Sequence, residues 1–189
     1  LELLDNFQFL KQLDGREIVL YRKLQELKSL NLHVKNHSKL HNQLWAPSNP
    51  SNLSKSIQEI EDITPYIKLT DNQKEYDIIR RFIHNMEFVI GIGRALRFEV
   101  RNKSDDRLLG MVVLASDVPS LECRDEYLGM DRNMWMTKKM MRHSSVMSSC
   151  VGVQPFANNM LGCKLVSMMV NESVVRNTWK EKYGDELVG

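Results

Sequence analysis

The sequence has few cysteines and few glycines, and it contains no long apolar run. Its three cysteines, among 189 residues, show no CxxC pair or other spacing typical of a metal site. Their odd number, with no visible secretory signal, favours reduced thiols in the cytoplasm. No apolar stretch approaches the roughly 20 residues of a membrane span. These features argue against a disulfide scaffold, a metal module and a membrane partner.

Charge of one sign is not in excess either. Lys and Arg total 26 and Asp and Glu total 24, so the formal net charge is only +2. The distribution is uneven, because no acidic residue occurs from Arg132 to Asn171. Positive charge in this segment suits a phosphate-bearing partner, either DNA or a cofactor, and a solvated basic face balanced by acids elsewhere is the alternative. The candidate nucleic-acid contacts are Arg132, Lys138, Lys139 and Arg142.

Apolar spacing separates a helical first part from a mixed second part. Residues 1–45 are leucine-rich with helical spacing, which predicts a packing element or a docking site for a protein partner. The stretch 46–56, APSNPSNLSKS, has two prolines and four serines and predicts a linker. We therefore expect a helical region over 1–65 and a second domain over 66–189. The final residues, ELVG, are typical of the start of a strand, so we expect this domain to be truncated.

The second domain mixes the two periodicities. Residues 70–90 predict a helix begun by Thr70 or Asp71. RALRFEVRN and RLLGMVVLAS then predict a hairpin around the turn KSDD, with apolar and charged residues alternating along the first strand. A strand at CVGV, a helix after it and a last helix closed by Gly184 follow. This order predicts an α+β, or layered α/β, domain with a mixed sheet and flanking helices.

The stretch 148–170, SSCVGVQPFANNMLGCKLVSMMV, predicts a strand, a polar loop and a helix. Such an arrangement can direct backbone N–H groups at an anion. The alternative is a plain turn, in which the two asparagines only cap the helix. Neither GxxxxGK[ST] nor GxGxxG is present, so this is not a P-loop or a Rossmann turn. The candidate cofactor contacts are Val151, Val153, Gln154, Asn158, Asn159, Gly162 and Cys163.

The order of these parts resembles the GNAT acyltransferase fold. RLLGMVVL is similar to the end of the GNAT hairpin, and SSCVGVQPFANNMLGCKL is similar to its cofactor-binding motif. The resemblance implies an acyl-CoA whose pyrophosphate lies on the loop and whose pantetheine runs between two splayed strands. The usual motif is Q/R-x-x-G-x-G/A, and here Gly162 is the loop's only glycine.

A closer resemblance covers about residues 94–189. LLGMVVLASDV, RDEYLGMD, SSCVGVQPFANNMLGCKL and WKEKYGDELVG are similar to the Druantia DruA-like family and its phage-encoded relatives. Those relatives resemble the Mom-type DNA-modification proteins of phages, which are GNAT-like. The resemblance implies a role in phage–host conflict, inside a bacterial host or a phage-infected cell, with DNA as the setting.

Acyl transfer to an amine needs a base near the amine and charge stabilisation at the carbonyl. The candidate bases or substrate contacts are Asp117, Asp125 and His143, and Tyr183 is a candidate general acid. We expect Cys150 and Cys163 to be buried packing residues. Three hypotheses follow: a GNAT-like acyltransferase that modifies nucleic acid, a non-catalytic DNA-binding module of a phage or defence system, and an interaction protein that docks through its N-terminal helices.

Overall fold

The structure is a computed structural model that describes residues 14–17, 40–84, 93–137 and 139–187. The chain divides into two compact units, Leu1–Leu40 and His41–Gly189. In the first unit the described residues form a short helical turn, where the Asp14 carboxylate accepts the N–H groups of Arg16 and Glu17. The docking element predicted over 1–45 therefore lies mostly outside the described residues. The stretch 46–56 belongs to the second unit.

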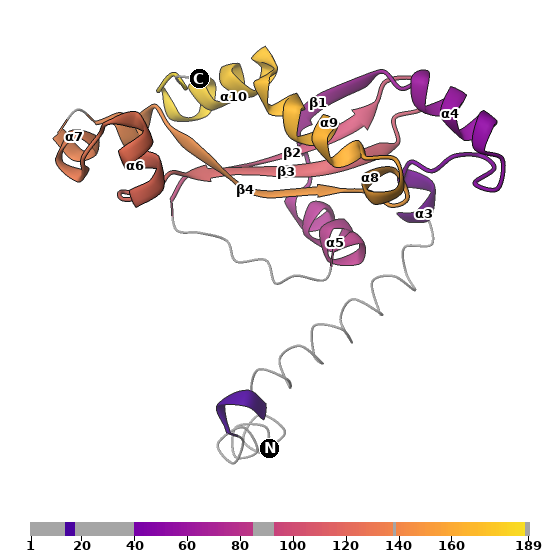
Figure 1. Ribbon diagram of the computed structural model, residues 1–189, viewed down its shortest axis with the longest axis horizontal. Helices are drawn as coiled ribbons and strands as arrows, with labels where there is room; N and C mark the ends of the chain where they lie inside the picture. The colour runs from indigo at the N-terminus through magenta and orange to yellow at the C-terminus, as the bar shows by residue number, and fades with distance from the viewer. Residues whose placement is uncertain (1–13, 18–39, 85–92, 138, 188–189) are drawn as a thin grey trace. The chain divides into compact units, whose positions relative to one another are not determined.

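A four-stranded sheet forms the centre of the second unit (Figure 1). Its strands lie side by side in chain order, and each ladder is antiparallel. The predicted hairpin is confirmed, with Phe98 opposite Val112. The α+β class is also confirmed, but the mixed sheet is not seen, because the only parallel pairing among the described residues is an isolated bridge between Leu44 and Leu108. The strands are β1 (Pro65–Leu69), β2 (Ala95–Asn102), β3 (Leu108–Ser116) and β4 (Ser145–Gly152).

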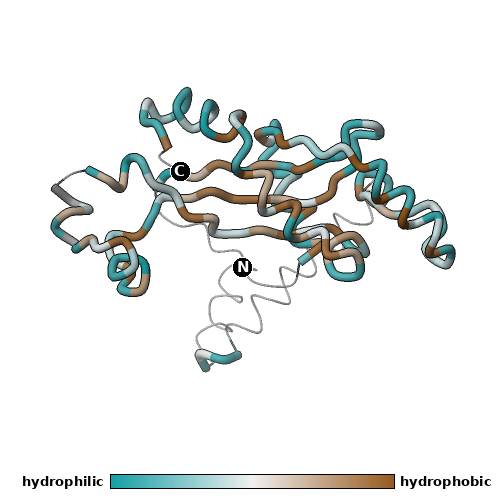
Figure 2. The backbone as a smooth tube through the Cα atoms, turned by 45° about the horizontal axis from the view of Figure 1, so that its top comes forward, coloured by the Kyte–Doolittle hydropathy of each residue, from teal (hydrophilic) through white to brown (hydrophobic). Residues whose placement is uncertain are grey.

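Helices cover both faces of this sheet (Figure 1). One face carries α5 (Gln73–Ile83), and the other carries α4 (Leu53–Glu61), α9 (Gly162–Met168) and α10 (Ser173–Tyr183). The apolar core lies on the second face, and Figure 2 shows apolar residues concentrated along the central strands. Its fully buried members come from the strands and from the helices above them, and they include Phe98, Val112, Val166 and Trp179.

The charged face of β2 is buried under α5. Arg97 and Glu99 are only 8% and 7% exposed. Thr70 donates a hydrogen bond to Glu99 at 2.8 Å, and Arg97 lies 3.5 Å from the Asp77 carboxylate. The predicted alternation is therefore right, and the polar face is paired inside the protein because a helix covers it.

The ends of the helices differ from the prediction at two places. Asn72, and not Thr70 or Asp71, caps α5, because its side chain accepts the N–H groups of Lys74 and Glu75. The helix ends at Ile83, earlier than predicted, since His84 has an extended backbone, and residues 85–90 of the prediction lie outside the described residues. At the other end of the chain Gly184 closes α10 with a left-handed backbone, as predicted.

Short elements connect the strands. The remaining bounds are α3 (Leu40–Gln43), α6 (Glu122–Leu128), α7 (Arg132–Thr137), η1 (Met140–Arg142), α8 (Phe156–Asn159) and η2 (Met169–Asn171). After Gly184, the described residues 185–187 form no strand, contrary to the prediction. None of the described helices is long and apolar enough to cross a membrane.

The guanidinium of Arg94 joins three segments next to β2. It donates hydrogen bonds to the carbonyl oxygens of Met141 and Arg142 in η1. It also lies 3.6 Å from the Asp185 carboxylate, just after α10, and 4.8 Å above the Trp179 ring. The segment before β4 and the segment after α10 are thus attached to the start of β2 by one side chain.

Candidate binding site at the edge of the sheet

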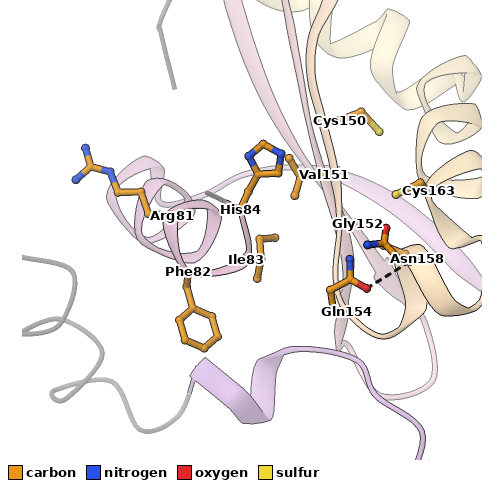
Figure 3. A pocket seen from close by; sticks show the side chains of 11 residues that line it. Arg81, Phe82, Ile83, His84, Cys150, Val151, Gly152, Gln154, Asn158 and Cys163 are labelled. Atoms are coloured by element: carbon orange, nitrogen blue, oxygen red, sulfur yellow. Dashed lines mark hydrogen bonds between the residues drawn. The ribbon is translucent and has the colours of Figure 1, made fainter. Parts of the chain in front are cut away.

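A hollow of about 540 Å³ lies beside the end of β4 (Figure 3). One wall comes from the last turn of α5 and the residue after it. The other comes from β4, the loop that follows it, and the starts of α8 and α9. The lining residues are Arg81, Phe82, Ile83, His84, Cys150, Val151, Gly152, Gln154, Ala157, Asn158 and Cys163.

The hollow occupies the edge of β4 because β4 is the last strand of the sheet. It pairs with β3 on one side, and on the other side no described strand pairs with it. Successive side chains of a strand point to opposite faces. Figure 3 accordingly shows Val151 and His84 on one side of β4, and Cys150 and Cys163 on the other. A ligand in the hollow would therefore meet side chains from both faces and the outer backbone groups of the strand.

The lining carries positive charge and no negative charge. Arg81 is exposed and His84 is half-buried, and neither Asp nor Glu is among the lining residues. The amide side chains of Gln154 and Asn158 add hydrogen-bonding capacity. The side-chain oxygen Oε1 of Gln154 accepts the backbone N–H of Asn158 at 3.3 Å. This hydrogen bond holds the Gln154 side chain over the loop. This lining favours a ligand that carries negative charge and hydrogen-bonding groups.

The predicted anion-binding loop is more closed than the sequence indicates. Its polar residues form the short helix α8, so the two asparagines end that helix and do not cap the next one, whose N-cap is Leu161. Gly162 is buried, and a Cβ atom there would lie 2.3–2.5 Å from the ring of Phe156. This glycine is therefore required by packing. Val153, just after β4, donates its N–H to the carbonyl oxygen of Leu109 in β3.

The structure brings part of the predicted cofactor set together. Val151, Gln154, Asn158 and Cys163 line the hollow. Val153, Asn159 and Gly162 do not line it.

Two of the predicted catalytic carboxylates share one guanidinium. Arg124 donates to Asp117 at 2.7 Å and to Asp125 at 2.7 Å and 2.8 Å. The Trp135 indole N–H donates to Asp125 at 2.9 Å, and Arg124 lies 4.0 Å above the Trp135 ring. Partial removal from water acts to raise the pKa of Asp125, but hydrogen bonds from Leu121, Arg124 and Trp135 keep it below its ordinary value. The arrangement ties α6 to α7.

The other two predicted catalytic residues also make contacts within the protein. The Tyr183 hydroxyl accepts the N–H of Ala95 at 2.9 Å and donates to its carbonyl oxygen at 3.0 Å. The ring nitrogen Nδ1 of His143 lies 2.9 Å from the carbonyl oxygen of Glu186. Tyr183 thereby attaches α10 to the first residue of β2.

The predicted catalytic residues and the predicted cofactor residues lie toward opposite ends of the sheet. Ser145, the first residue of β4, pairs with Ser116, which directly precedes Asp117, and Gly152 at the far end pairs with Gly110. At about 3.3 Å per residue these ends of β4 are roughly 23 Å apart. The predicted acids and bases therefore do not line the hollow.

The predicted nucleic-acid contacts are described in part. Lys139 and Arg142 are exposed, at the N-cap and at the last residue of η1. Lys138 and the side chain of Arg132 lie outside what the structure describes.

Sequence reasoning missed Arg81 and His84. They lie at the end of α5, more than 60 residues before β4, so only the packing of α5 beside β4 brings them to the hollow. The available signal was the basic pair Arg80-Arg81 at the end of the helix.

The family model described as Druantia protein DruA matches residues 15–188. The chain belongs to the DruA family. A curated relative, Druantia protein DruA from Escherichia coli (strain UMEA 4076-1), is 29% identical over 98 residues, which are 51% of this chain and 23% of that protein. The matched part of the chain thus spans about a quarter of that DruA protein. No solved structure matches the chain. The DruA resemblance is confirmed and extends well before residue 94, whereas the GNAT and Mom resemblances are not shown.

Proposed function

We propose that this DruA-family chain is a component of an anti-phage defence system and that it binds a phosphate-bearing ligand, of the acyl-CoA type, in the hollow beside β4. The observation that carries the proposal is the lining of that hollow. It includes Arg81, His84 and the amide side chains of Gln154 and Asn158, and it includes no carboxylate. Phosphates are bound by guanidinium groups and by amide donors. Negative charge is also absent from the adjoining sequence, from Arg132 to Asn171.

The open edge of β4 favours a ligand with amide groups. The outer edge of β4 offers backbone N–H and C=O groups next to Cys150, Val151 and Gly152. An amide-containing arm such as pantetheine can pair with a strand edge as an added peptide strand does. Its phosphates would then reach Arg81, and its acyl end would extend along β4.

Acyl transfer to an amine, with nucleic acid as the acceptor, is the reaction that follows from such a donor. The thioester C–S bond breaks, an amide C–N bond forms, the amine loses a proton, and CoA leaves as the thiol. His84 is the lining residue suited to take that proton, because histidine is the side chain most often used as a general base. Asp117 and Asp125 act mainly as anchors for Arg124 in this scheme.

A second candidate function is non-catalytic binding of DNA. The observation that favours it is the contact between Gly162 and Phe156, since packing accounts for the one glycine of the loop. Lys139 and Arg142 are exposed outside the hollow and could contact DNA phosphates. In that case the hollow would take a nucleotide of the DNA strand.

Calorimetric titration with CoA, acetyl-CoA and a single-stranded oligonucleotide tests both functions. We expect Arg81→Ala to weaken CoA binding at least tenfold, because a charged hydrogen bond contributes about 1.5–3 kcal/mol. Lys74→Ala is the matched control, since Lys74 is exposed on the same helix and does not line the hollow. Equal CoA affinity in wild type and Arg81→Ala would contradict the proposed site. Oligonucleotide binding without any CoA binding would establish the second function instead.

A further inference from the structure

Two of the three cysteines lie together in the hollow. Cys150 is on β4 and Cys163 is in the first turn of α9, and both line the hollow. Cys163 is exposed and Cys150 is half-buried against the apolar core. The prediction that both are buried packing residues is therefore wrong for Cys163. The third thiol, Cys123, is exposed on α6 and does not line the hollow.

Gly152 brings the two thiols close to each other. A Cβ atom on Gly152 would lie 3.1 Å from the Cys163 sulfur, so that sulfur stands directly over the strand. Cys150 is two residues before Gly152 and points to the same face of β4, about 6.6 Å along the strand. Figure 3 shows both side chains on this face, beside α9. A disulfide needs the two Cα atoms about 4.4–6.8 Å apart, so the bond forms when the start of α9 moves toward Cys150.

We propose that Cys150 and Cys163 form an oxidisable dithiol, which hydrogen peroxide converts to a disulfide between β4 and α9. In the first step the Cys163 thiolate attacks one oxygen of hydrogen peroxide and the O–O bond breaks. Cys163 becomes a sulfenic acid, and the hydroxide that leaves takes a proton from solvent and is released as water. In the second step the Cys150 sulfur attacks the sulfenic sulfur, the S–O bond breaks, and a second water leaves as the S–S bond forms. The peroxide is reduced by two electrons and the two thiols are oxidised by two.

The environments of the two thiols suit these different roles. Cys163 is the thiol that a dissolved oxidant can reach, since it is exposed at the mouth of the hollow. Burial raises the pKa of the Cys150 thiol, and the neighbouring Cys163 adds to that rise. Cys150 therefore stays protonated and reacts second, from inside the protein. The product would bridge one wall of the hollow, so it would change the width of the site next to Gly152.

Peptide mapping by mass spectrometry tests the inference without any ligand. The full chain is treated with hydrogen peroxide, free thiols are blocked, and linked peptides are identified with and without dithiothreitol. We expect a Cys150–Cys163 peptide, 2 Da lighter than the two thiol peptides together, that the reductant separates. The Cys123→Ser variant should form it equally well. Cys150→Ser should instead accumulate sulfinic acid at Cys163.

Two results would overturn the inference. One is oxidation of Cys163 to sulfinic acid in wild type while Cys150 stays a free thiol. The other is a wild-type chain in which Cys123 reacts and the pair does not. Because the readout is a covalent mass change, it stands apart from the ligand titrations, and either proposal can fail alone.

Discussion

Gly162 lies against the ring of Phe156, with 2.3–2.5 Å between ring atoms and the place of a Cβ atom. We predict that Gly162→Ala lowers the free energy of unfolding by about 1–3 kcal/mol, because the added methyl group overpacks a buried site. Urea denaturation measures the effect. Cys163→Ala, at the exposed next position, is the control and should change little. If Gly162→Ala unfolds at the wild-type midpoint, the glycine is not required by packing, and the anion-loop interpretation regains strength.

The carboxylate of Asp125 should make the stability of the folded protein depend on pH. Its pKa is lowered in the folded state, so the folded protein binds fewer protons than the unfolded chain near pH 4. The stabilisation is present above about pH 4 and is lost as the pH falls through the lower folded pKa. The melting temperature of wild type should therefore fall more steeply on acidification than that of Asp125→Asn. Glu122→Gln, on the same helix, should follow wild type, and parallel curves for all three proteins would refute the anchoring role.

A substitution of Tyr183 tests whether this residue has a structural role or a catalytic one. Tyr183→Phe removes the hydroxyl that bonds both backbone groups of Ala95. We predict a loss of about 1–2 kcal/mol in unfolding free energy, since two hydrogen bonds are removed. CoA affinity should stay within twofold, because the residue does not line the hollow. Unchanged stability with a loss of acyl transfer would instead assign Tyr183 to catalysis.

Lys139 and Arg142 test the DNA-binding function. Both are exposed, and each phosphate contact contributes about one unit to the slope of log affinity against log salt. The double variant Lys139→Ala with Arg142→Ala should weaken DNA binding at low salt and reduce that slope by about two. Lys103→Ala, at the exposed turn between β2 and β3, provides the control. An unchanged slope of log affinity against log salt would show that η1 is not part of the DNA interface.

The periodicity of apolar residues predicted the central strands of the sheet but not the edge strand β1. The alternation of Leu96, Phe98 and Val100 predicted β2 correctly, since burial on one face imposes a period of two. The neighbouring strand β1 was missed because it is only five residues long, starts with a proline and is half-buried, so its pattern is weak. Pairing with β2 makes it a strand, and that pairing is not encoded locally.

The candidate site was predicted on one side only. Val151, Gln154, Asn158 and Cys163 are close in sequence, so a local motif was enough to group them. Arg81 and His84 come from a distant helix, and their position depends on how α5 packs on the sheet. Packing against Phe156 accounts for the single glycine, and a sequence does not distinguish an approach to a ligand from an approach to an aromatic ring.

The contacts of Arg94 have a consequence for local unfolding. The same guanidinium holds η1 and the residues after α10, so neither segment can open while those bonds persist. Amide hydrogens around Met141 and Asp185 should then exchange with solvent as one cooperative unit, although 44 positions separate them in the chain. Opening of this unit would uncover the first residues of β4 while leaving the hollow at its far end intact.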